Sequence, residues 1–111
     1  MILILAQHDD YHVEIVTRRL KQLGADFVWF DGAQFPVGAE LSITYSATGR
    51  RQRVLRVGSE VYDLSRITVV WERSPNAIVL HEQVADDITR NYLHGECEDF
   101  LADVWHTLDC P

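Results

Sequence analysis

The stretch V-V-W-E-R-S-P, residues 69–75, is an apolar run that stops abruptly at charged and turn-forming residues. The apolar character begins at Ile67, and a continuous run of this kind is typical of a strand covered on both faces. A second such run, I-L-I-L, occupies residues 2–5 and stops at the polar group Q-H-D-D. Two covered strands predict a layered α/β fold with a sheet in its interior.

The residues that follow the first run predict a β-α-β unit. Residues 11–23 carry apolar side chains at helical spacing, either Asp9 or Asp10 can cap the start of this helix, and Gly24 can end it. F-V-W-F, residues 27–30, then predicts a second strand. The connection between the two strands is expected to be parallel and right-handed.

The middle of the chain changes to strict alternation of apolar and polar residues. Residues 40–46 and 51–57 flank Thr48 and Gly49, which predicts an antiparallel hairpin, and a short strand is expected at residues 61–62. Four arginines at positions 50, 51, 53 and 56 are expected on a solvated outer face of this hairpin.

The last third of the chain predicts one long helix. Its apolar stripe runs from Val84 to Leu108, and Gly95 predicts a kink or a close approach of another backbone. The expected fold class is therefore α/β, with a central mixed sheet, a β-α-β start, an antiparallel meander and a long C-terminal helix.

Length and composition exclude several classes of protein. The 111 residues predict a single domain over residues 1–111. A net charge of −7, from 17 acidic and 10 basic residues, disfavours nucleic acid and anionic membranes as partners. No stretch approaches the ~18 apolar residues that span a bilayer, and the apolar run at residues 1–6 lacks the basic flank and cleavage site of a signal peptide, so neither insertion nor export is expected. Two cysteines without a C-x-x-C pattern indicate neither a zinc site nor a disulfide framework, so a cytoplasmic protein is expected.

Motifs for catalysis are missing from the sequence. There is no G-x-S-x-G elbow, no G-x-G-x-x-G and no G-x-x-x-x-G-K-[ST], so we expect no catalytic residue and no means of holding ATP in this chain alone. His8 and His12 stand four apart but lack a third ligand at a recognisable spacing, so no metal site is expected.

Polar residues nevertheless follow each of the predicted interior strands. If these strands are parallel, the residues share the carboxyl edge of the sheet, where open α/β proteins bind ligands. Simpler roles stay open: helix capping for the aspartates after the first strand, a turn for the serine, and an ion pair with Asp31 or Glu72 for the arginine. The ligand-binding candidates are Asp9, Asp10, Asp31, Arg73 and Ser74.

The order of these segments resembles the N-terminal domain of the microviridin-type ATP-grasp ribosomal peptide maturases, the MvdD-like graspetide synthetases. The resemblance covers residues 1–111, and two motifs carry most of it: D-x-x-x-F-P at Asp31, Phe35 and Pro36, and V-W-x-R-x-P at residues 70–75. This chain departs from the family pattern at Trp29, Glu72 and Ser74, where the family tends to have basic or aromatic residues.

The resemblance implies a pre-ATP-grasp domain, the lobe in front of an ATP-grasp fold. Enzymes of this family use ATP and Mg²⁺ to activate a carboxylate side chain of a precursor peptide as an acyl phosphate. A hydroxyl or a lysine amine then closes an ω-ester or ω-amide ring. The nucleotide, metal and catalytic residues of the family lie downstream of this domain. The implied partners are therefore ATP-grasp lobes, in cis or in trans, and a precursor peptide.

A different class of function is a free-standing binding or dimerisation module with the same fold. The last helix has more apolar side chains than one sheet face needs, and surplus apolar surface usually marks an interface. A homodimer is expected on this ground, with interface candidates Phe100, Leu101, Val104 and Trp105. A small-molecule enzyme that uses Asp31 and Arg73 is a third, weaker hypothesis, since neither a nucleophile nor a base stands beside them in the sequence.

Overall fold

The apolar run at the N-terminus forms the central strand of a parallel sheet in the computed structural model, which describes residues 1–73 and 76–108. Strand β1 (Ile2–Leu5) pairs with β2 (Phe27–Phe30) on one side and with β6 (Val69–Glu72) on the other, and both pairings are parallel. Helix α1 (Tyr11–Gln22) connects β1 to β2. The predicted β-α-β start is therefore confirmed.

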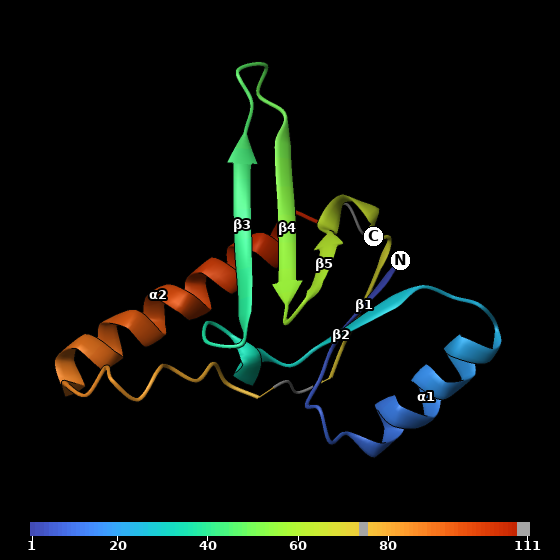
Figure 1. Cartoon of the computed structure of the whole chain (residues 1–111), viewed down its shortest axis with the longest axis horizontal. Coiled ribbons are helices and arrows are strands. Elements are labelled where there is room, and N and C mark those ends of the chain that lie inside the picture. Colours follow the sequence, from blue (N-terminus) through green and yellow to red (C-terminus); the bar gives the residue numbers. More distant parts are fainter. Residues whose placement is uncertain (74–75, 109–111) are drawn as a thin grey trace.

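Successive side chains of the parallel sheet enter two different cores because strand residues alternate between faces. Ile4 and Trp29 pack with Val13 of α1 in a small cluster, whereas Leu3 and Phe30 belong to the main core on the opposite face. In Figure 1 the parallel sheet lies between α1 and the layer formed by α2 and the hairpin. Coverage on both faces explains the continuous apolar sequence of β1.

The alternating segments form a second, antiparallel sheet. Strand β3 (Ala39–Tyr45) pairs with β4 (Arg51–Val57), and β4 pairs with β5 (Glu60–Asp63). Gly49 and Gly58 have φ angles of +82° and +60°, which L side chains rarely adopt, in the turns of this meander. The α/β fold class is confirmed, but the strands in the described part of the chain divide into two sheets of three strands rather than one mixed sheet.

The separation of the sheets begins directly after β2. A single 3₁₀ turn, η1 (Gly32–Gln34), and the loop that follows it carry the chain out of the parallel sheet. A second 3₁₀ turn, η2 (Leu64–Arg66), returns the chain from β5 to β6. Leu55 of β4 and Leu64 of η2 are almost fully buried in the main core, so the inner face of the antiparallel sheet closes this core.

Helix α2 (Asp87–His106) is shorter at its start than the sequence pattern predicted, and it continues through Gly95. Asp86 caps it by accepting from the Thr89 backbone N–H, so Val84 lies outside the helix. Outside the backbone of the helix itself, no described part of the chain comes within 4 Å of the position that a Cβ on Gly95 would take, so the predicted close approach is wrong. No helix in the part of the chain described here is long and apolar enough to cross a membrane.

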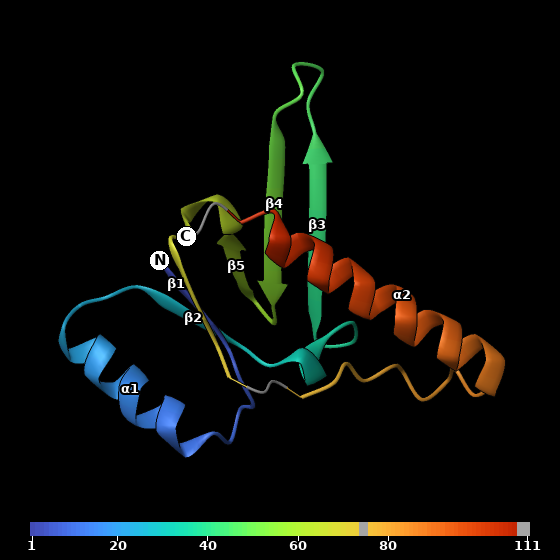
Figure 2. The ribbon, with the colours of Figure 1, turned by 180° about the vertical axis from the view of Figure 1, so that it is seen from behind.

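The two halves of α2 have different environments. Leu101 and Val104 are buried in the main core, whereas Ile88 and Tyr92 are 80% and 66% exposed. Figure 2 shows the reason: the first turns of α2 extend beyond both sheets, and only the later turns cross the hairpin, in front of it in this view.

The expectation that all four arginines of the hairpin face solvent is wrong for Arg53. Its neighbours in the hairpin, Arg50, Arg51 and Arg56, are exposed, but Arg53 is only 6% exposed. Its Nη1 donates to the backbone oxygen of Thr107 and, at 2.8 Å, to the Thr107 hydroxyl. The guanidinium therefore links β4 to the C-terminal end of α2, where a cation also interacts favourably with the helix dipole.

Candidate functional site

The carboxyl ends of the three parallel strands bring four of the five predicted ligand-binding residues to one edge. Asp9 and Asp10 follow β1, Asp31 follows β2 and Arg73 follows β6. Ser74 lies outside the described residues. The placement agrees with parallel strands, and a role of these residues in ligand binding stays a prediction.

Asp10 is the capping residue of α1 and also the partner of Arg73. Its Oδ1 accepts from the His12 and Val13 backbone N–H groups, and its Oδ2 accepts from Arg73 Nε at 2.9 Å. The hydrogen bond from Arg73, with help from the backbone donors, holds the pKa of Asp10 below its ordinary value. Asp9 is exposed and makes no hydrogen bond with a described residue.

Arg73 is held from two sides. Asp10 fixes its Nε, and the guanidinium carbon lies 5.6 Å from the centre of the Trp71 ring, within the range of a cation–π contact. Its ion-pair partner is thus Asp10, and neither Asp31 nor Glu72 pairs with it. The terminal nitrogens of Arg73 have no hydrogen-bond partner among the described residues.

Asp31 is almost completely buried and accepts four hydrogen bonds. The Ala33 backbone N–H donates to Oδ1 at 3.0 Å, while the His8 backbone N–H, His8 Nδ1 and Asn76 Nδ2 lie 2.9–3.0 Å from Oδ2. Burial alone raises the pKa of a carboxyl group, but these donors outweigh it, so the pKa of Asp31 lies below its ordinary value. Asp31 is therefore a buried carboxylate that joins three segments of the chain.

His8 is the exposed partner of this buried carboxylate. The bond to Asp31 raises the pKa of His8. Because a carboxylate only accepts hydrogen bonds, the ring must carry a proton on Nδ1, which leaves Nε2 in solvent. No group of three or more His, Cys, Asp or Glu residues in the described ranges could hold a metal ion.

The sequence did not indicate that Asn76 belongs to this edge, and it suggested His12 rather than Asp31 as the neighbour of His8. A signal for His8 existed, because it stands at the end of an interior strand beside predicted edge residues. Asn76 carried no local signal. It reaches Asp31 only because Gly32 lets the backbone of residue 76 pass closely: a Cβ on Gly32 would stand 2.3 Å from the Asn76 carbonyl oxygen.

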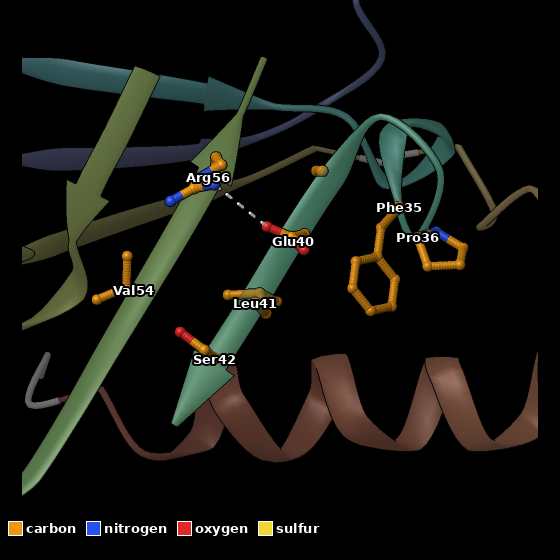
Figure 3. Close-up of a pocket in the computed structure, with 8 residues that line it drawn as sticks. Phe35, Pro36, Glu40, Leu41, Ser42, Val54 and Arg56 are labelled. Carbon is orange, nitrogen blue, oxygen red and sulfur yellow. Dashed lines mark ion pairs between the residues drawn. The ribbon is translucent and has the colours of Figure 1, made fainter. Parts of the chain in front are cut away.

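The motif residues Phe35 and Pro36 have packing roles near a separate pocket of about 260 Å³. Phe35 stacks on Phe100 with ring centres 6.4 Å apart. Figure 3 shows both motif side chains beside β3, with the ion pair between Glu40 and Arg56 crossing the outer face of the hairpin. Since this pair balances the local charge, the pocket offers no strong electrostatic preference for a ligand.

The predicted interface residues are largely used inside the chain. Leu101 and Val104 are buried in the main core, Phe100 stacks on Phe35, and Trp105 meets Phe30 edge to face at 5.8 Å. The apolar surface that α2 leaves exposed lies instead at Ile88 and Tyr92.

The sequence matches the MvdD pre-ATP grasp domain over residues 1–111, which is the whole chain. The chain belongs to this family. No curated protein sequence matches it.

Solved structures show the same fold. A RiPP-associated ATP-grasp ligase of Chryseobacterium gregarium, in complex with ADP and a leader and core peptide, matches with a TM-score of 0.85 and 22% identity over 98% of this chain and 33% of that chain. The macrocyclase MdnC of Microcystis aeruginosa MRC, bound with precursor peptide MdnA, matches with a TM-score of 0.84 and 17% identity over 98% of this chain and 35% of that one.

The macrocyclase MdnB of the same organism matches with a TM-score of 0.83 and 19% identity, over 98% of this chain and 36% of that chain. The domain therefore spans about a third of the length of these enzymes.

Proposed function

We propose that this chain is the pre-ATP-grasp domain of a ligase that modifies a ribosomally made precursor peptide by closing ω-ester or ω-amide rings. The observation that carries the proposal is the family match over the whole chain, together with the fold shared with peptide-modifying ATP-grasp enzymes. In this role the domain supports the nucleotide-binding lobes, in cis or in trans, and contacts the precursor peptide.

The residues at the carboxyl edge of the parallel sheet are not suited to bind a nucleoside triphosphate. Arg73 and His8 are each paired with a carboxylate there, Asp9 and Glu72 add negative charge, and Lys21 is the only lysine in the sequence. A phosphate site needs backbone N–H groups or unpaired cations. ATP and Mg²⁺ therefore belong to the lobes in this proposal, and no chemical step is assigned to the domain.

The proposal also places the domain in the cytoplasm, where ATP is supplied and thiols stay reduced. The test of the non-catalytic role is ADP release by the purified chain with ATP, Mg²⁺ and a precursor peptide. Release at the level of a protein-free control is expected. Turnover that scales with the concentration of the chain would contradict the proposal.

A free-standing dimerisation module is the second candidate, and the exposed pair Ile88 and Tyr92 favours it. These residues stand four apart and share one face of α2. Light scattering of the concentrated chain tests this candidate: a dimer that becomes a monomer in the Tyr92→Asp variant supports it, and a monomeric wild type argues against it.

A further inference from the structure

The carboxyl edge of the parallel sheet opens into a cavity of about 440 Å³ between the sheet and α2. Its wall contains the last residues of β1 and β2, Leu5 and Phe30, together with Leu101 and Trp105 of α2. A second cavity of about 430 Å³ shares Leu5, Glu72 and Trp105 with the first, so the two adjoin at the end of β6.

The charged groups of this cavity have one sign. Glu72 and Glu98 are the acidic residues that line the first cavity, His106 lines the second cavity beside Glu72, and neither arginine nor lysine from the described ranges lines either one. Glu72 forms no hydrogen bond or ion pair with a described residue. Within the described ranges, the Glu98 carboxylate makes one ion pair, with His94 at 3.7 Å on the surface of α2. The site therefore disfavours anions and attracts a cation.

The apolar walls are packed against other parts of the chain. Phe30 and Trp105 pack edge to face with ring centres 5.8 Å apart, Leu101 is buried, and residue 76 passes close to Gly32 at the rim. Leu5 and Phe30 are 4% and 1% exposed, whereas Glu72 and Glu98 are exposed. The cavity thus combines an apolar interior with carboxylates at its solvent side.

We propose that this cavity binds a lysine or arginine side chain of a peptide. The aliphatic stem of such a side chain packs against apolar walls while its charged end stays near carboxylates, and an indole such as Trp105 adds cation–π attraction. That the peptide is a precursor rests on the proposed function, but the recognition of a cationic side chain does not.

The experiment is an NMR titration of the 111-residue chain at low salt with acetyl-Gly-Lys-Gly-amide. The Trp105 indole N–H is the reporter. The matched ligand, acetyl-Gly-norleucine-Gly-amide, keeps the stem and lacks the charge. We expect the lysine ligand to bind with a Kd of about 1 mM and the norleucine ligand to bind at least about tenfold more weakly, because one charged contact is worth about a factor of ten.

Two double variants separate local attraction from overall charge. Glu72→Gln with Glu98→Gln is expected to weaken lysine binding about tenfold, whereas Glu60→Gln with Glu96→Gln, which makes the same charge change outside the cavity, leaves it within about twofold. Equal binding of both ligands, equal effects of both double variants, or shifts confined to residues outside the cavity would overturn the inference. If lysine binding fails while a reconstituted ligase still closes rings, only this inference fails. If lysine binding holds and ring closure fails, the proposed function fails.

Discussion

Asp31 joins three parts of the chain through one buried carboxylate. It holds the segment after β1 through His8, the turn after β2 through Ala33, and the segment after β6 through Asn76. The sequence motif therefore marks a structural joint at the edge where the ligand-binding candidates meet. A residue of this kind sets the shape of the edge even if it never touches a ligand.

Replacing Asp31 tests this joint. Asp31→Ala is expected to lower the free energy of unfolding by about 2–4 kcal/mol, because it leaves buried donors unsatisfied. Asp26→Ala is the control: Asp26 is exposed and pairs with Arg66 at 3.5 Å, so its loss should cost less than about 1 kcal/mol. Urea denaturation followed by tryptophan fluorescence measures both, and equal losses would contradict the structural account of Asp31.

The Asp31–His8 pair also predicts how stability depends on pH. The pKa of Asp31 lies below its ordinary 3.8, so its contribution is present above that value and is lost as pH falls through the folded pKa. The pKa of His8 lies above its ordinary 6.5, so its contribution is complete below that value and is lost as pH rises through the folded pKa. The pair therefore stabilises the fold most between about pH 4 and about pH 6.5.

Denaturation of the wild type and of Asp31→Asn across this pH range measures the effect. The difference in stability between the two proteins should be largest inside the window and should shrink on both sides of it. The His8 pKa, followed by NMR, should fall in the variant. An unchanged His8 pKa would show that the pair does not form in solution.

At the scale of elements, two glycines with different surroundings give opposite predictions. Gly95→Ala is expected to stabilise the chain by about 0.5–1 kcal/mol, because α2 continues through this position with open space beside it. Gly32→Ala should destabilise it by more than about 2 kcal/mol, since the new Cβ would meet the Asn76 carbonyl oxygen. Thermal unfolding of both variants checks these predictions. A destabilised Gly95→Ala variant would contradict the open space beside Gly95 in α2.

The link between β4 and α2 makes another element-scale prediction. Arg53→Ala should cost about 2–3 kcal/mol, because it opens a cavity and removes the bonds to Thr107. Arg53→Met should cost less, since it keeps the apolar stem and removes the buried Nε, which has no partner. Arg51→Ala, two residues away and exposed, is the control and should change stability by less than about 0.5 kcal/mol. If Arg51→Ala and Arg53→Ala lower the free energy of unfolding equally, the contacts of Arg53 with Thr107 do not stabilise the packing of β4 against α2.

At the scale of the whole molecule, local patterns predicted the elements well and their long-range contacts poorly. The covered strands, α1 and the hairpin follow from periodicity, because burial on one or two faces leaves a direct mark on the sequence. The burial of Arg53 and the reach of Asn76 left no such mark, since both depend on segments that are distant in sequence. The exposed start of α2 was missed for the same reason: an apolar stripe does not reveal where its partner sheet ends.

The direction of the three parallel strands decided which predicted residues meet. It brought Asp10 beside Arg73, a pair that sequence spacing alone did not single out, and it grouped both with Asp31 at one edge. The acidic cavity at the same edge is lined by Glu72 and Glu98, which come from β6 and α2. No single motif contains both of them.

The central claim is that these residues work as one domain of a peptide-modifying ligase. Its most direct test is mass spectrometry of a precursor peptide after incubation with ATP, Mg²⁺ and ATP-grasp lobes, with and without this domain. The loss of one water per ring is expected only when the domain is joined to the lobes or added to them. Rings formed equally well without the domain, or never formed with it, would contradict this role of the domain.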